Sequence, residues 1–80
     1  MENEDFEEPK FKVREYTKLE LALLYFPALG MDSAVKKLNR WVKTNTLLVA
    51  ALDRVGWQRR RHSYLPREVA LIVFYLGTPG

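Results

Sequence analysis

The sequence has no cysteine and a single histidine, His62, among its 80 residues. Without cysteine there is neither a disulfide framework nor a thiolate metal site, and one histidine without several carboxylate partners cannot build a zinc centre. The few glycines form no phosphate-cradling motif; they are Gly30, Gly56, Gly77 and Gly80. We therefore expect no metal and no cofactor.

Residues suited to catalysis are also scarce. Nucleophilic catalysis needs a nucleophile, a base within reach and usually an orienting group, and the serines and threonines here have only His62 to share. Most of the acidic residues after residue 10 are explained as helix caps or first-turn residues, so no carboxylate pair for acid and base work is evident. We expect a protein that is not an enzyme and has no small-molecule substrate.

A long hydrophobic stretch is missing too. The longest apolar run, Val69–Leu76, is far shorter than the roughly 20 residues of a membrane span, and the acidic start is unlike the basic start of a secretory signal. We expect no membrane partner and a cytoplasmic location. With 48% hydrophobic residues, the chain has the material for one core and too little length for two.

The net charge of +3 is unevenly distributed. Residues 1–10 hold five acids against Lys10 alone, whereas residues 11–80 hold twelve Lys and Arg against five acids, a net charge of +7. We interpret residues 1–10 as a disordered acidic leader and residues 11–80 as a single helical domain. The basic domain favours a polyanionic partner, although basic residues on a small domain also serve simply to solvate it.

Local signals predict two helices in the first half of the domain. Thr17 and Glu20 match a capping box, which starts a helix at Lys18 that runs to about Phe26 and buries Leu19, Leu23 and Phe26. Asp32 is an N-cap candidate for a second helix covering about Ser33 to Lys43. Its apolar face comprises Val35, Leu38 and Val42, with Ala34 and Trp41 beside them.

Two further helices are predicted after Asn45. Asn45 caps the first of them, Gly56 ends it and Trp57 folds back on it, while its shared face holds Leu48, Ala51, Leu52 and Val55. The last helix runs from Pro66 to about Leu76, closes at Gly77 and buries Val69, Ile72, Val73 and Leu76.

The expected fold class is mainly α, with four short helices around one core in a helix-turn-helix-like arrangement. A small two-stranded ribbon pairing Phe11–Arg14 with Arg61–Tyr64 remains an option, because Phe11–Arg14 alternates apolar and basic residues. Both tryptophans, Trp41 and Trp57, are assigned to packing.

The second helix carries a basic stripe opposite its apolar face, with no acid at the spacing that would pair with it. This stripe and the polar run Arg59–His62 predict binding to nucleic acid, with duplex DNA preferred. In that interpretation Lys36, Lys37, Arg40 and Lys43 neutralise phosphates and Ser33 lies near a base edge or a phosphate. The run contributes a wing or backbone clamp made of Arg59, Arg60 and Arg61.

The alternative is a protein-interaction module or homodimer without nucleic-acid binding. Several apolar residues lie outside the faces assigned to the core, and together they offer a docking surface; they are Leu21, Leu24, Tyr25, Leu47, Phe74 and Tyr75.

Several of these segments carry a resemblance to a known family. The run from Phe11 to Pro27, the motif Leu38-Asn-Arg-Trp-Val, the pair Gly56-Trp57 and the segment Leu65-Pro-Arg-Glu-Val resemble a family of small basic Bacteroidetes proteins, a domain of unknown function. That family implies no activity. The order of two helices, a basic loop and Tyr-Leu-Pro-Arg-Glu-Val is more loosely similar to MerR-type and excisionase-type winged helix-turn-helix domains, which implies DNA binding through the second helix and the wing. The connection Pro27–Met31 is longer than the usual three to four residues of the tight motif.

Overall fold

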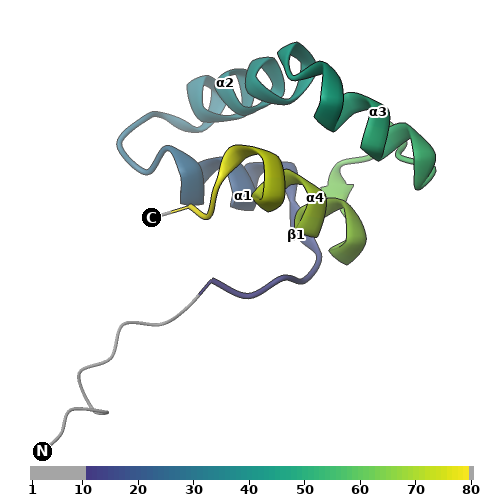
Figure 1. The fold of residues 1–80 in the computed structure, drawn as a ribbon. Coiled ribbons are helices and arrows are strands. Elements are labelled where there is room, and N and C mark those ends of the chain that lie inside the picture. Colours follow the sequence, from purple (N-terminus) through teal and green to yellow (C-terminus); the bar gives the residue numbers. More distant parts are fainter. Residues whose placement is uncertain (1–10, 80) are drawn as a thin grey trace, which may run out of the picture.

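The computed structural model describes residues 11–79, so the expected acidic leader, residues 1–10, lies outside the described part of the chain. The elements follow in the order β1 (Tyr16–Thr17), α1 (Lys18–Tyr25), α2 (Met31–Thr44), α3 (Thr46–Arg54), β2 (Ser63–Tyr64) and α4 (Pro66–Leu76). Figure 1 shows α2 and α3 lying over α1 and α4. The mainly helical fold with a small antiparallel ribbon is confirmed.

Most helix ends lie where the local signals placed them. The capping box of α1 is complete, because Thr17 Oγ1 accepts from the Glu20 amide at 3.0 Å and Glu20 Oε1 accepts from the Thr17 amide at 2.9 Å. Asn45 Oδ1 caps α3 by accepting from the Leu48 amide. α3 then closes in a Schellman motif: Gly56 has φ +80°, and the Trp57 amide donates to the Leu52 carbonyl at 3.0 Å.

The start of α2 was predicted wrongly. The N-cap is Gly30, in extended geometry, and its carbonyl accepts the Ala34 amide at 2.8 Å, so the helix begins at Met31. Asp32 therefore lies inside the first turn, where its charge still complements the positive end of the helix dipole but its side chain caps nothing.

The ribbon exists, but its first strand is not Phe11–Arg14. Instead β1 pairs with β2 in the register Tyr16 to Tyr64 and Thr17 to Ser63. This register places both tyrosines in the core, where Tyr16 is 5% and Tyr64 1% exposed. Burial of the two rings thus fixes a pairing that short alternation in sequence cannot specify.

The core face of α1 also differs from the prediction. Leu21 and Ala22 are fully buried, whereas Leu19 is 37% exposed, and Leu23 and Phe26 are only partly buried against the core. An eight-residue helix with leucine on every side gives periodicity little to choose from, and packing against α2 makes the choice. The core is completed by residues of the other three helices: Ala34, Leu38, Val42, Leu48, Leu52, Val69 and Ile72.

One charged side chain lies inside this core. Glu68, in the first turn of α4, is 0% exposed. Its carboxylate accepts two hydrogen bonds from the Arg61 guanidinium, at 2.8 and 3.1 Å, and a third from the Leu65 amide at 2.9 Å. The loop before β2 is therefore tied to α4 through Arg61.

Candidate nucleic-acid interface

The amphipathic design of α2 is present in the structure. Leu38 and Val42 are buried, with Ala34, and the opposite side of this 14-residue helix faces solvent. The exposed side carries all five residues predicted for it: Ser33, Lys36, Lys37, Arg40 and Lys43. At 1.5 Å per residue, the helix presents these side chains, from Ser33 to Lys43, along about 15 Å.

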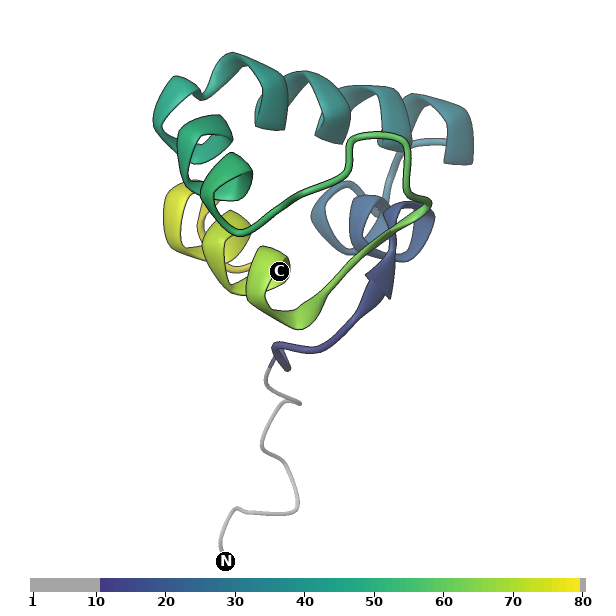
Figure 2. The same cartoon turned by 90° about the vertical axis from the view of Figure 1, so that its right-hand side faces the viewer.

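Three adjoining hollows run along this side of the molecule. The first, here named the loop hollow, has a volume of about 260 Å³ and is lined by Lys18, Asn39, Val42, Lys43, Trp57, Arg59, Arg60 and Tyr64. The second shares Asn39 and Lys43 with it, and the third shares Lys36 and Arg40 with the second. Figure 2 shows that the segment between α3 and β2, which lines the loop hollow, rises beside α2 before it descends to β2.

The three hollows form one continuous basic surface, defined here by its cations: Lys18, Lys36, Lys37, Arg40, Lys43, Arg59 and Arg60. Within residues 11–79, no aspartate or glutamate lines any of the three. The described residues of this surface therefore form no ion pairs among themselves that an arriving anion would have to break, and their charges are available to an external polyanion.

Aromatic rings hold Lys37 in place on α2. Its Nζ lies 4.8 Å from the centre of the Phe26 ring and 5.8 Å from that of Trp41. The two rings meet edge to face with centroids 4.8 Å apart. Trp41 was assigned to packing, but it is 39% exposed and lies outside the core cluster, so it forms part of the surface and packs there against Phe26.

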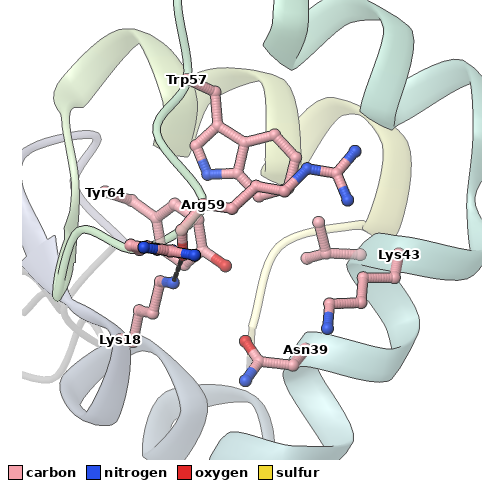
Figure 3. Close-up of a pocket in the computed structure, with 8 residues that line it drawn as sticks. Lys18, Asn39, Lys43, Trp57, Arg59 and Tyr64 are labelled. Carbon is pink, nitrogen blue, oxygen red and sulfur yellow. Dashed lines mark hydrogen bonds between the residues drawn. The ribbon is translucent and has the colours of Figure 1, made fainter.

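A lysine from α1 fixes the loop beside α2. Lys18 Nζ donates to the Arg59 carbonyl at 2.6 Å, and its own amide donates to the His62 carbonyl at 2.8 Å. Figure 3 shows Lys18, Asn39 and Lys43 reaching into the loop hollow from α1 and α2. Burial, with a further contribution from nearby Lys43, lowers the pKa of Lys18. Neither Lys18 nor Asn39 was predicted as a site residue. Lys18 was missed because only the tertiary fold brings α1 to this surface.

Arg59, Arg60 and Arg61 do not act as one group. Arg59 and Arg60 are exposed and line the loop hollow, with the Arg59 guanidinium 5.0 Å from the Trp57 ring centre. Arg61 instead faces Glu68, and its hydrogen bond to that carboxylate raises the pKa of the guanidinium. Of the predicted residues, the structure brings seven together and places Arg61 in an internal ion pair.

The apolar residues of the alternative interpretation do not all lie on the surface. Leu21 belongs to the core, and Tyr25 and Tyr75 are partly buried against it, which removes Leu21 from any docking surface. The exposed members lie on three different helices: Leu24 at 42%, Leu47 at 68% and Phe74 at 78% exposure.

Two other kinds of site receive no support in residues 11–79. That part of the chain contains no cluster of three or more histidine, aspartate or glutamate residues suited to a metal ion. None of its helices combines the length and the apolar character needed to cross a membrane.

Comparisons with known proteins give a family and nothing beyond it. No curated protein and no solved structure matches the chain. The expected resemblance to a domain of unknown function is confirmed in that coarse form, while its Bacteroidetes origin and the winged helix-turn-helix similarity stay predictions. The family model described as domain of unknown function DUF4248 matches residues 12–79, and the chain belongs to this family.

Proposed function

We propose that this domain binds duplex DNA through the basic surface, with α2 as the docking helix. The observation that supports this proposal is the continuity of three hollows that, among residues 11–79, are lined by seven cations and no carboxylate. A duplex presents a dense row of phosphates, and a protein that neutralises several of them gains affinity by releasing condensed counterions.

Each part of the basic surface has a role in this proposal. Lys36, Lys37 and Arg40, on the outermost side of α2, contact phosphates, and Ser33 lies in the same hollow near the start of the helix. Lys43 leads from the helix to the loop hollow, where Arg59 and Arg60 clamp the neighbouring backbone. The proposal depends on this charge distribution and not on a tight helix-turn-helix, because residues 26–30 separate α1 from α2.

The test is binding to a short duplex across a salt series. If all seven cations contact phosphates, the slope of log K against log salt reaches about −6, and affinity falls roughly 10³- to 10⁴-fold between 50 and 200 mM salt. The variant Lys36→Ala/Lys37→Ala/Arg40→Ala should lose two to three contacts, which weakens binding and flattens the slope by about 2 to 3.

A matched control removes the same charge elsewhere. Lys12, Arg54 and Arg67 are exposed and line none of the three hollows, so Lys12→Ala/Arg54→Ala/Arg67→Ala should keep nearly the wild-type slope. Equal losses in both triple variants would mean that only net charge matters and would refute α2 as the docking helix. Absence of binding by the wild type at physiological salt would refute the proposal altogether.

A second candidate function is a homodimer or protein partner surface, which the exposure of Phe74 (78%) and Leu47 (68%) favours. Exposed apolar side chains mark an interaction site where they form one contiguous patch. Sedimentation should then show a dimer that Leu47→Ser/Phe74→Ser converts to monomer. A monomeric wild type across the micromolar range rejects the homodimer.

A further inference from the structure

The loop hollow contains a polar atom without a partner. Among the buried side-chain nitrogens and oxygens of residues 11–79, Trp57 Nε1 is the one that lacks a hydrogen bond. A buried N–H without an acceptor is unfavourable, and natural structures rarely leave one in that state. Trp57 lines the hollow, and Figure 3 shows its indole nitrogen on the side facing Tyr64 and Lys18.

A second donor lies at the same wall. Tyr64 is 1% exposed, and its hydroxyl can donate a hydrogen bond. Because Tyr64 lines the loop hollow, the small exposed part of its side chain faces that space. Burial raises the pKa of Tyr64 to about 12, so the hydroxyl keeps its proton and remains a donor.

Two cations stand beside these neutral donors. Lys18 Nζ lies 5.6 Å from the centre of the Tyr64 ring and uses one of its protons for the Arg59 carbonyl, which leaves others for a ligand. Lys43 reaches in from α2, close enough that its charge lowers the pKa of Lys18. An anion between the two ammonium groups would relieve their repulsion and supply an acceptor to the donors.

The volume restricts the kind of ligand. About 260 Å³ is below the roughly 300–1,000 Å³ typical of pockets that enclose a whole small molecule. A single oxyanion group, attached to something that continues outside, suits a space of this size. Phosphate has several acceptor oxygens and a charge that matches two lysines.

We propose that the loop hollow is a specific phosphate-binding site in which Lys18 and Lys43 provide the charge and the Trp57 indole N–H and Tyr64 hydroxyl provide neutral hydrogen bonds. This deepens the proposed function, on which it rests for the source of the phosphate, a nucleic-acid strand. Unlike the exposed lysines of α2, this site holds one phosphate at a fixed position and so sets the register of the protein on the backbone.

The two tryptophans of the chain allow a direct test by NMR. Inorganic phosphate is titrated into the full chain at constant ionic strength, with chloride as the balancing salt, and both indole N–H resonances are followed. Trp57 should shift with saturation in the millimolar range or below, while the Trp41 indole, outside the hollow, stays in place. A shift shared by both indoles, an unsaturated drift, or no shift at all overturns the site.

Variants assign the contacts. Lys18→Met and Lys43→Ala should each weaken phosphate binding by about tenfold, and Tyr64→Phe, which removes one oxygen and keeps the ring, should weaken it severalfold. Arg67→Ala removes an equal charge from a residue that does not line the hollow and should leave binding within about twofold. If Arg67→Ala is as damaging as Lys43→Ala, the attraction is general and the site is refuted.

A last experiment identifies the source of the phosphate and tests the phosphate site separately from the proposed DNA binding. Short duplexes with and without a terminal 5′-phosphate, and a nucleoside monophosphate, replace the inorganic ion. A Trp57 shift with both duplexes supports an internal strand phosphate. A shift with inorganic phosphate and the monophosphate but no duplex binding keeps the site and refutes the proposed function. Duplex binding that leaves the Trp57 indole unmoved keeps the proposed function and overturns the site.

Discussion

The contact between Arg61 and Glu68 leads to the sharpest stability prediction. In Arg61→Met, the fully buried Glu68 carboxylate loses two hydrogen bonds and its only close countercharge within residues 11–79, and keeps the Leu65 amide. Breaking a buried ion pair from one side costs about 3–5 kcal/mol. The Arg61 side chain is 26% exposed, so some water already reaches the pair, and we expect the lower end, about 3 kcal/mol.

The same pair should be replaceable as a unit. Exchanging a buried ion pair for apolar residues of similar size is often neutral or stabilising, because the cost of desolvating both charges disappears. Arg61→Met/Glu68→Leu should therefore recover most of the lost stability. The Leu65 amide would lose its side-chain acceptor, at a cost of about 1 kcal/mol, so recovery should stop short of the wild type.

Thermal and urea unfolding followed by circular dichroism measures both variants. For a domain of this size 1 kcal/mol corresponds to about 4–8 °C, so Arg61→Met should lower Tm by roughly 12–24 °C. A loss below about 1 kcal/mol would show that Glu68 behaves as a surface carboxylate and would refute the reasoning. A double variant that is less stable than Arg61→Met would also refute the reasoning, because the cost of desolvating the two charges would then be small.

Three further predictions concern single positions. Gly30→Ser should stabilise by up to about 1 kcal/mol in urea unfolding, because a Cβ at Gly30 meets nothing within 4 Å and α2 lacks a side-chain cap; any loss of stability contradicts this. Gly56→Ala should destabilise by about 1–2 kcal/mol in the same assay, because Gly56 has φ +80°, and an unchanged midpoint would argue against the Schellman turn. The phenol of Tyr64 has a pKa of about 12 in the folded protein against 10 in the unfolded chain. Its contribution to the free energy of unfolding is therefore fully present below pH 10 and is lost as pH rises through 12. Unfolding free energy should fall by about 2–3 kcal/mol over that range, less so in Tyr64→Phe; equal alkaline loss in both proteins would assign the effect to other groups.

Where a helix end is specified by neighbouring residues, the sequence was enough to predict it. Thr17 and Glu20 interact across three residues, and Gly56 needs only the turn that precedes it, so their roles do not depend on the rest of the fold. The start of α2 was missed because the prediction took the side chain of Asp32 as the N-cap signal, whereas the observed N-cap is Gly30. The Gly30 carbonyl accepts the first helical hydrogen bond, and this backbone contact sets the start of α2 although the Asp32 side chain favours an N-cap position.

Long-range packing accounts for what the sequence could not predict. The pairing of Tyr16 with Tyr64 joins residues far apart in the chain, and the burial of Leu21 depends on the helix that lies over it. The predicted face of α2 was right because its apolar and basic residues separate cleanly around the helix, whereas those of α1 do not. Lys18 lines the candidate site because the fold places α1 beside the loop. The sequence alone does not show this neighbourhood, so Lys18 was not predicted.

The three consecutive arginines of the run Arg59–Arg61 have two different roles. Arg61 turns inward and binds Glu68, which anchors the loop to α4, and Lys18 holds the Arg59 carbonyl from the other side. Fixed at these two points, the loop presents Arg59 and Arg60 next to Lys43 of α2. The internal ion pair is thus a precondition for the basic surface and not a part of it. An Arg61 variant that loses DNA affinity should consequently lose stability as well, whereas the Lys36, Lys37 and Arg40 variant should lose affinity alone.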